Sequence, residues 1–250
     1  MSLLECVQQK RLLKINNMET NKIILNSENK ELELIDETNI FVELSNAELS
    51  LKLAYFSKVE TLNINCDLNE NSKLNVTFVD YSNGSLNADV KVNLNGIGAT
   101  SDWKLASLAT SSFEKKYDIS FIHNKENTTA IMNNYGVSKD TANIIFTGVN
   151  HIKEYCPKFV TRQNAKIILF DEYSKGTASP VLKIDENDVV ASHGAVVGQI
   201  SDEHMFYLMS RGLTKKEARA LIILGYISPF TIHFSESTKE RISNAIKEVI

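Results

Sequence analysis

His193 is the side chain in this sequence whose type and setting best suit chemistry. It lies in the segment Ala191-Ser-His-Gly-Ala-Val-Val-Gly198, between a region of alternating apolar residues and a segment with helical periodicity. The glycines predict a turn, and a histidine exposed in a turn can bind a metal through its neutral imidazole or exchange protons near neutral pH. A histidine beside glycines is also commonly a hydrogen-bonded structural residue, so the residue types leave both interpretations open.

Three cysteines are further candidate ligands. Cys6, Cys66 and Cys156 are odd in number, far apart and without a Cys-x-x-Cys pair, which argues against a disulfide framework and against a zinc site. Cys66 alternates with apolar residues and is predicted to lie in the core. Cys156 follows shortly after His151 and could bind a soft metal, but a buried free thiol is the simpler interpretation.

One acidic cluster and one glycine pair resemble sites only superficially. Asp185, Glu186 and Asp188 surround an asparagine, a setting that suits a solvated turn better than a metal site. Gly194 and Gly198 lack the spacing and the lysine of a phosphate-binding loop. The chain is therefore not predicted to be an ATPase.

Composition limits the class of protein. The chain has 250 residues, of which 43% are apolar, so it can bury a sizeable core in one large or two small domains. Its 27 basic and 31 acidic residues give a net charge of −4 without a block of like charges, which argues against nucleic acid as a partner. No apolar run is long enough to span a membrane, and the first residues do not read as a signal peptide, so a cytoplasmic protein is predicted.

The apolar pattern changes once along the chain, near residue 200. Before that point, apolar residues alternate with polar ones in short segments, and proline is absent before residue 157, which favours long sheets. Periodicity alone does not separate a sandwich or barrel from a parallel β-helix, and no repeat of fixed length is visible. The predicted strands are Leu49–Tyr55, Leu62–Leu68, Leu74–Phe78, Leu86–Leu94, Tyr117–Ile122, Thr128–Met132, Ala142–Val149, Ala165–Phe170, Val181–Ile184 and Asp188–Ala191.

Three short helices are predicted after Ser201. The first ends at Gly212, and the second opens with the capping box Thr214-Lys-Lys-Glu217 and ends near Tyr226, before a proline. The third opens with a second capping box, Ser237-Thr-Lys-Glu240. Because short amphipathic helices are not stable alone, these must pack on the β region, on one another or on a partner.

The segment around His193, continued through Ser201-Asp-Glu-His-Met-Phe-Tyr-Leu-Met-Ser-Arg-Gly-Leu213, resembles a signature of the SufB/SufD family. These proteins are the scaffold components of the SUF iron–sulfur cluster assembly system. The segments that begin at Gly136, Gln163 and Ser179 follow in the family's order. The resemblance covers about residues 135–227, and there is little room before residue 22 for the family's N-terminal helical extension, so a minimal member is expected.

The resemblance implies a mainly β fold. A right-handed parallel β-helix core would be followed by a small C-terminal helical domain. Together with the change of period, this predicts an N-terminal segment at residues 1–21, a β-helix core at 22–199 and a helical domain at 200–250.

The departures from the family pattern decide which residues can be carried over. SufB-type chains have a glutamate where Gly194 stands and a cysteine near the position of Asn164, so their cluster-building residues are not assigned here. His193-Gly194 instead matches the SufD type, in which the corresponding histidine is implicated in assembly at the SufB–SufD interface. Some SufD-type chains have a cysteine where Ala191 stands, so this segment is not expected to supply a thiol ligand.

The resemblance therefore predicts a SufD-like scaffold subunit and not an enzyme. It would join a SufB/SufD-type protomer, identical or different, through the β core, and the ABC-type ATPase SufC through the helices. Predicted contacts with the ATPase are Met205, Tyr207, Arg211 and Glu217. His193 would bind a transient iron–sulfur cluster at the protomer interface, exposed when dimerisation of the ATPases twists the paired scaffolds. Family complexes also bind reduced flavin, to which no residue of this sequence is assigned.

Two other interpretations stay open. A β-helical polysaccharide lyase or hydrolase would need paired carboxylates or basic residues on one exposed sheet face, usually with calcium sites, and few aromatic platforms accompany Trp103 here. The second is a degenerate scaffold that assembles without binding a cluster. A neighbouring ABC ATPase gene would favour the SUF system, whereas neighbouring carbohydrate genes would favour the enzyme.

Overall fold

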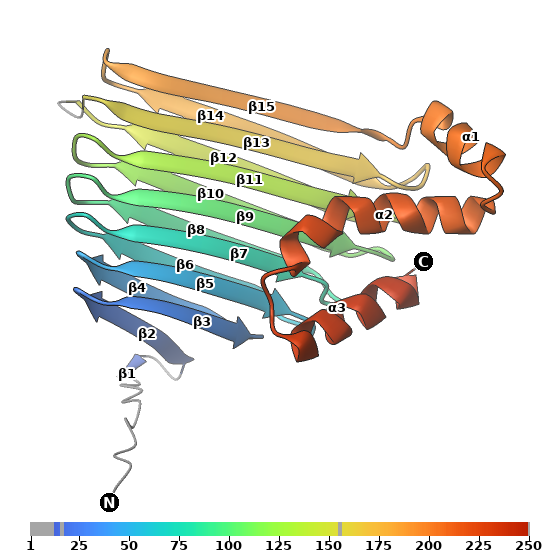
Figure 1. Cartoon of the computed structure of the whole chain (residues 1–250), viewed down its shortest axis with the longest axis horizontal. Coiled ribbons are helices and arrows are strands. Elements are labelled where there is room, and N and C mark those ends of the chain that lie inside the picture. Colours follow the sequence, from blue (N-terminus) through green and yellow to red (C-terminus); the bar gives the residue numbers. More distant parts are fainter. Residues whose placement is uncertain (1–12, 16–17, 155–156, 250) are drawn as a thin grey trace, which may run out of the picture.

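The computed structural model describes residues 13–15, 18–154 and 157–249, so Cys6 and Cys156 lie outside the described residues. Its strands form two facing sheets (Figure 1). The first sheet contains, in spatial order, β1 (Leu13–Ile15), β2 (Met18–Asn26), β4 (Asn39–Ser45), β6 (Thr61–Leu68), β8 (Leu86–Leu94), β10 (Glu114–His123), β12 (Asn143–Ile152) and β14 (Lys175–Ile184). The second contains β15 (Val189–Gln199), β13 (Phe159–Leu169), β11 (Thr129–Ser138), β9 (Thr100–Ala109), β7 (Lys73–Asp80), β5 (Glu48–Tyr55) and β3 (Asn29–Ile35).

From β2 onward, successive strands alternate between the two sheets, and each pairs in parallel with the strand two positions along the chain. Two strands and their turns therefore make one coil, and the coils stack into a solenoid. The predicted parallel β-helix is confirmed, and the sandwich and the barrel are excluded.

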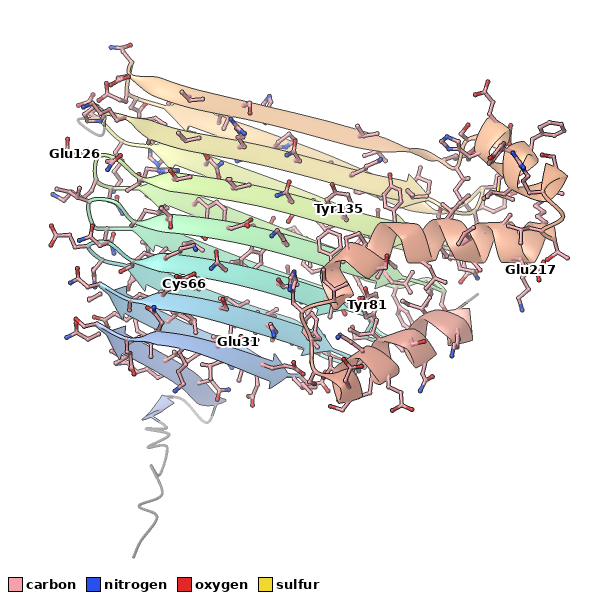
Figure 2. All side chains as sticks on the ribbon, in the orientation of Figure 1. Glu31, Cys66, Tyr81, Glu126, Tyr135 and Glu217 are labelled. Atoms are coloured by element: carbon pink, nitrogen blue, oxygen red, sulfur yellow. The ribbon has the colours of Figure 1, made fainter. Side chains whose placement is uncertain are left out.

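The interior of the solenoid is filled by every second side chain of each strand. In β6, Leu62, Ile64, Cys66 and Leu68 are fully buried while the residues between them are not, so the predicted core position of the Cys66 thiol is confirmed (Figure 2). Burial raises the pKa of this thiol. Side chains at the same position of successive coils stack on one another, because the parallel register keeps them aligned.

Aromatic rings form the largest stack in the middle coils. The ring centroid of Phe78 lies 5.1 Å from that of Tyr55, 6.1 Å from that of Trp103 and 5.9 Å from that of Tyr117. All four side chains are at most 1% exposed. Trp103 lies on β9, a strand that the sequence analysis did not predict. Its inward positions include two buried serines, Ser101 and Ser107, which break the apolar alternation.

The interior also encloses a charged pair. Nζ of Lys115 lies 2.9 Å from Oδ1 of Asp80, and both side chains are fully buried. The carboxylate of Asp80 also accepts hydrogen bonds from the hydroxyl of Tyr117 at 2.5 Å and from Ser82, whose carbonyl accepts a bond from Lys115. Burial lowers the pKa of Lys115, and the adjacent carboxylate opposes that shift. Every partner of this pair comes from the fold itself, which is what a buried charge requires.

Three helices follow the strands: α1 (Asp202–Ser210), α2 (Lys215–Thr231) and α3 (Glu236–Val249). α2 and α3 lie across the outer face of the second sheet, near the ends of its strands, and α1 extends from the end of β15 (Figure 1). Ile223, Ile227 and Phe230 of α2 bury their side chains against outward-facing residues of that sheet. Within the described part of the chain, no helix has the length and apolar character needed to cross a membrane.

Two helix ends that were predicted from the sequence are confirmed. Gly212 adopts a φ of 94° and donates a backbone hydrogen bond to Met209, while Leu213 donates one to Leu208, which together end α1 in a Schellman motif. The capping box of Thr214 and Glu217 is present at the start of α2.

Two other predicted helix ends are wrong. α2 does not end near Tyr226 but continues through Pro229 to Thr231, because packing of Ile227 and Phe230 on the sheet outweighs the helix bond that proline removes. α3 begins at Glu236 rather than after Ser237. The Oγ of Ser235 accepts a hydrogen bond from the backbone nitrogen of Thr238 at 3.4 Å and so occupies the cap position two residues earlier.

Polar clamps fix both ends of this helical layer to the β-helix. Nη2 of Arg219 on α2 lies 2.5 Å from the carboxylate of Asp171, and Arg219 also donates to the carbonyl of Phe170 at 2.6 Å. On α3, Glu33 of β3 accepts hydrogen bonds from Ser235 at 2.7 and 2.9 Å and from Thr238 at 2.5 Å. The first coil and the last helix are thereby joined.

Candidate functional site

His193 lies in the middle of β15, not in a turn. The strand was predicted to end at Ala191 but continues to Gln199, so the glycines at positions 194 and 198 are strand residues. Both have a negative φ or extended backbone and can pair in register with β13, which overrides the turn preference of glycine. The imidazole is nevertheless exposed, as predicted.

The exposure of His193 follows from its position in the last coil. It pairs in register with Gln163 of β13, which pairs with Met132 of β11, and these two inner neighbours are buried. His193 therefore belongs to the row of residues that faces the interior. β14 and β15 are the terminal strands of their sheets, so no described strand covers them. The end of the solenoid is open at this point, and the imidazole reaches solvent from an inward-facing position.

The terminal coil also exposes apolar side chains. Val190 and Val196 are each 57% exposed on β15, and Val181 and Ile184 are 37% and 39% exposed on β14. β-branched residues on a long edge strand mark a surface that can pair with another strand. The edge with His193 therefore has the character of an interface.

The two positions at which this chain departs from the SufB type are direct neighbours. Asn164 pairs in register with Gly194, and an ideal Cβ at Gly194 would lie 3.6 Å from Oδ1 of Asn164. Both residues are exposed on the outer face of the second sheet. Ala191 pairs with Thr161 in the inward row that includes Gln163. In this chain an amide side chain and a glycine therefore lie side by side at Asn164 and Gly194.

The carboxylate cluster lies in the exposed turn between β14 and β15, as predicted. Oδ2 of Asp185 lies 3.1 Å from Nε2 of His151, which is an exposed contact on the outer face of β12. Among residues 13–15, 18–154 and 157–249, no group of three histidine, cysteine or acidic side chains is arranged to hold a metal ion. Within the described chain, His193 therefore does not belong to a preformed group of metal ligands.

The predicted ATPase contacts lie in the helical part of the chain. Met205 and Tyr207 are on α1, Arg211 directly follows it, and Glu217 is in the first turn of α2. Tyr207 is 56% exposed, and the guanidinium of Arg211 lies 5.2 Å from its ring centroid and donates a hydrogen bond to its hydroxyl at 3.3 Å. Met205 is half-buried and lines a cleft with Lys215. No residue of α1 is buried, so the helix presents much of its surface to solvent.

Glu217 has a local role that the sequence prediction did not separate from binding. Its carboxylate accepts hydrogen bonds from the backbone nitrogen of Thr214 at 2.8 Å and from the Thr214 hydroxyl at 2.7 Å. These bonds lower the pKa of Glu217. Substitution of this residue would remove the cap of α2 as well as any contact with a partner.

Two residues with functional potential were missed by sequence reasoning. Phe206 is 75% exposed on α1, which is unusual for a phenylalanine and extends the surface formed by Tyr207. In the sequence, Phe206 lies outside the apolar face of the predicted helix, and this position could have indicated its exposure. Gln163 is 2% exposed beside His193, but its burial depends on a register that no local pattern specifies.

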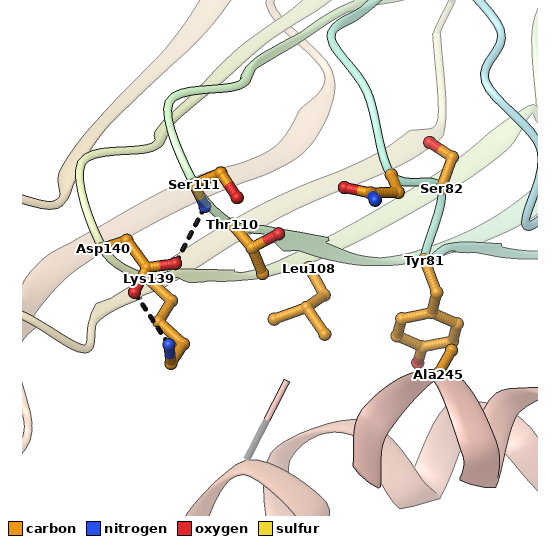
Figure 3. A pocket seen from close by; sticks show the side chains of 9 residues that line it. Tyr81, Ser82, Leu108, Thr110, Ser111, Lys139, Asp140 and Ala245 are labelled. Carbon is orange, nitrogen blue, oxygen red and sulfur yellow. Dashed lines mark hydrogen bonds and ion pairs between the residues drawn. The ribbon is translucent and has the colours of Figure 1, made fainter. Parts of the chain in front are cut away.

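A cleft of about 290 Å³ lies between α3 and the turns that follow β7, β9 and β11 (Figure 3). Asp140 at its rim accepts a hydrogen bond from the backbone of Ser111 and pairs with Lys139, each at 2.8 Å. Burial opposes ionisation of Asp140, but these bonds outweigh it and lower its pKa. The charged residues that line the cleft neutralise each other, and none of its lining residues comes from β15, so it does not add to the site around His193.

Comparison with known proteins identifies the family to which this chain belongs. A family model described as "SUF system FeS cluster assembly, SufBD core domain" matches residues 19–226, from the first parallel coil into α2. The chain belongs to the SufB/SufD family. This family is one of scaffold and assembly components, and the match covers most of the chain, including β15.

Relatives in this family include SufD proteins. The chain is 29% identical over 180 residues to the iron–sulfur cluster assembly protein SufD of Bacillus subtilis, which is 72% of this chain and 41% of that protein. It is 27% identical over 159 residues to a SufBD family protein of Staphylococcus epidermidis, covering 63% of this chain and 34% of that one. The matched part thus spans about two fifths of SufD, and the likeness is of the SufD type.

Proposed function

We propose that this chain is a SufD-like scaffold subunit in iron–sulfur cluster assembly. The observation that carries the proposal is the place of His193, in the middle of an exposed terminal strand of a SufB/SufD-type β-helix. A histidine in that position can reach a cluster held between two protomers, whereas a histidine inside the solenoid cannot.

The open end formed by β14 and β15 supports pairing with a second protomer. One side of each strand carries backbone groups without a partner strand in the described chain, and strand addition to such an edge is a common mode of association. Val190 and Val196 would be covered in the process. The partner is a SufB/SufD-type protomer, either a second copy of this chain or a SufB-like chain.

The cluster itself is treated as cargo. Iron–sulfur clusters are commonly held by four side chains, and His193 supplies one nitrogen ligand in the SufD-like half. The remaining ligands would come from the partner protomer across the interface. We assign no residue to reduced flavin.

The helices are the proposed docking site of the ABC-type ATPase SufC. α1 has exposed aromatic side chains at Phe206 and Tyr207, with Arg211 beside them. Aromatic residues and arginine are enriched where protein interfaces gain most of their free energy. α1 follows β15 directly, so movement of the ATPases would be transmitted to the strand that carries His193.

The proposal is tested by His193→Ala in the purified complex. We expect unchanged folding and pairing but a several-fold lower iron and sulfide content, because the substitution removes a ligand without opening the core. His233→Ala is the matched control, since it removes another exposed imidazole that lies outside both β15 and α1. Normal loading of the His193 variant would contradict the ligand assignment and leave a scaffold that does not bind a cluster itself.

Pairing is tested separately by placing a charge on the edge. Val196→Glu should prevent association with the partner protomer, measured by analytical ultracentrifugation, because a buried unpaired carboxylate opposes the interface. Ile24→Glu is the control, since Ile24 is 51% exposed on β2 at the opposite end of the solenoid. Equal association of both variants would exclude the β15 edge.

Docking of the ATPase is tested on α1. Arg211→Glu and Tyr207→Ala should weaken co-purification with the ATPase and leave the unfolding transition in place, because neither residue is buried. Lys91→Glu, the same charge reversal on an exposed residue of β8, serves as the control. Glu217 is unsuited to this test because of its cap. Retained binding after substitution of both Tyr207 and Arg211 would contradict the assignment.

A further inference from the structure

The dipeptide Asn-Gly occurs twice in this chain, in two different settings. Asn83-Gly84 lies in the turn between β7 and β8, and Asn95-Gly96 lies in the turn between β8 and β9. An asparagine followed by glycine is prone to spontaneous deamidation, because glycine has no side chain to keep its backbone nitrogen away from the asparagine amide. Two copies of one dipeptide separate the effect of the fold from that of the local sequence.

Deamidation of such a pair needs only water. The backbone nitrogen of the glycine gives up its proton and bonds to Cγ of the asparagine, while the side-chain nitrogen takes up a proton and leaves as ammonia. Water then hydrolyses one of the two C–N bonds of the resulting cyclic imide. One product is aspartate, and the other is isoaspartate, in which the main chain runs through the former side chain. The reaction therefore requires a side chain that can turn and a backbone nitrogen without a hydrogen bond.

Asn83-Gly84 meets both requirements. Asn83 is exposed and lines the cleft beside α3, so water reaches it. Within the described chain, neither its side chain nor the N–H of Gly84 has a hydrogen-bond partner. Gly84 is covered by the side chain of Lys58, whose Cγ lies 2.9 Å from the place of an ideal Cβ. Because Lys58 is itself exposed, its side chain can change rotamer and move aside.

Asn95-Gly96 meets neither requirement. Nδ2 of Asn95 lies 3.3 Å from Oδ1 of Asp67, and Oδ1 of Asn95 accepts a hydrogen bond from Nδ2 of Asn124 at 2.8 Å. The N–H of Gly96 donates to the carbonyl of Leu68 at 3.0 Å, so the attacking nitrogen is occupied. Backbone atoms of the preceding coil lie as close as 2.0 Å to the place of an ideal Cβ on Gly96, which leaves this turn no room to reorient.

We propose that Asn83 is a site of spontaneous deamidation and that the fold protects Asn95 from the same reaction. The modified chain carries one more carboxylate at the rim of the cleft. In the isoaspartate product, the main chain also gains one methylene group at position 83. Neither change depends on the proposed role in cluster assembly.

The extra methylene group would act on the buried charged pair, because the residue before Asn83 is Ser82. The carbonyl and the hydroxyl of Ser82 accept hydrogen bonds from Nζ of Lys115 at 2.9 and 3.3 Å. The same hydroxyl donates to Oδ1 of Asp80 at 2.6 Å. A longer main chain in this turn would displace Ser82 from both charges, and a buried pair that loses hydrogen bonds is destabilising.

The reaction is measured in the purified folded chain at mildly alkaline pH by mass spectrometry of its peptides. We expect the Asn83 peptide to convert several-fold faster than the Asn95 peptide, and the two to convert at similar rates in the urea-unfolded chain. The rate at Asn83 should rise with hydroxide concentration, because the attacking nitrogen reacts after loss of its proton. Equal rates in the folded chain, or a faster reaction at Asn95, would overturn the proposal.

The effect on the buried pair is measured by urea unfolding after the incubation. The isoaspartate form should unfold at a lower urea concentration than the fresh chain, whereas Asn83→Asp, which has the charge without the methylene group, should unfold like the fresh chain. Asn83→Gln, incubated in the same way, is the control for changes elsewhere, since the longer side chain forms the cyclic imide much more slowly. An unchanged midpoint in the isoaspartate form, or an equal loss in Asn83→Asp, would reject the displacement of Ser82.

Discussion

His123 and His193 both project inward from a parallel strand, yet they lie in opposite environments. His123 on β10 has β8 on one side and β12 on the other, is fully buried, and its Nδ1 lies 2.8 Å from the hydroxyl oxygen of Thr128. His193 on β15 has only β13 beside it and is exposed. Neighbouring strands on both sides bury an inward histidine such as His123. A histidine on the terminal strand, such as His193, stays accessible to a ligand.

Hydrogen bonding of inward polar groups does not separate the two regions. In the middle coils, the carboxylate of Asp80 has partners on several sides. The hydroxyl of Ser101 and the indole nitrogen of Trp103 in the same coils lack a partner among the described residues, as does the amide oxygen of Gln163 nearer the open end. The difference between the regions is therefore one of exposure.

The largest expected effect lies in the middle coils. Phe78→Ala should lower the free energy of unfolding by about 3 to 5 kcal/mol, because it removes a fully buried ring that contacts three aromatic neighbours. Val196→Ala in the last coil should change it by about 0.5 kcal/mol or less. Urea denaturation of both variants measures the difference, and similar losses would contradict the division into a packed middle and an open end.

The two histidines should differ in their effect on pH-dependent stability. Burial lowers the pKa of His123 from 6.5 to about 4. The unfolded chain therefore binds a proton that the folded chain does not, and stability present above pH 6.5 is lost as the pH falls toward 4, by about 3 kcal/mol.

This slope is measured by thermal or urea unfolding across the window. His123→Leu should remove that part of the slope, whereas His193→Ala should retain it. If both variants kept the slope of the wild type, another group would be responsible for it.

An intermediate effect is expected where α3 meets the first coil. Burial opposes ionisation of Glu33, but hydrogen bonds from Thr238 and Ser235 outweigh it, so its pKa lies below the ordinary 4.5. The contribution of this clamp is present above pH 4.5 and is lost as the pH falls below it, through the lower pKa of the folded state.

Removal of one donor tests the clamp at neutral pH. Thr238→Val should make α3 open more easily by about 1 kcal/mol, seen as faster amide hydrogen exchange in α3 but not in the middle strands. Asn244→Ala, which removes an exposed polar side chain from the same helix, is the control. Unchanged exchange in the Thr238 variant would show that apolar packing alone holds α3.

The smallest effect on stability is expected at His193 itself. His193→Ala should change the free energy of unfolding by about 0.5 kcal/mol or less, because the side chain is exposed on an edge strand. Calorimetry of the purified chain measures this. A loss of about 2 kcal/mol would mean that the imidazole is a structural hydrogen-bonding residue, and would weaken the comparison with His123.

Local patterns predicted much of the fold but not its exceptions. Alternation placed Cys66 inside and identified most strands, because inward positions of a β-helix repeat with period two. It missed β2, β3 and β4, for which no strand was predicted, and it missed β9, whose inward serines are buried beside Trp103. It also ended the last strand at Ala191, since glycine at position 194 reads locally as a turn signal, and only pairing with β13 extends the strand to Gln199.

The sequence by itself determined the β-to-helix order, the helix caps at Gly212 and Thr214, and the family signature around His193, because each depends on neighbouring residues in the chain. Tertiary structure alone decided that Gln163 pairs with His193, that Asn164 pairs with Gly194, and that α2 continues through Pro229. Those relations join residues that are distant in sequence, or balance a local preference against packing with a distant sheet. The physical reason is that register between coils is set by the whole stack of strands, and exposure of the candidate site is set by where that stack ends.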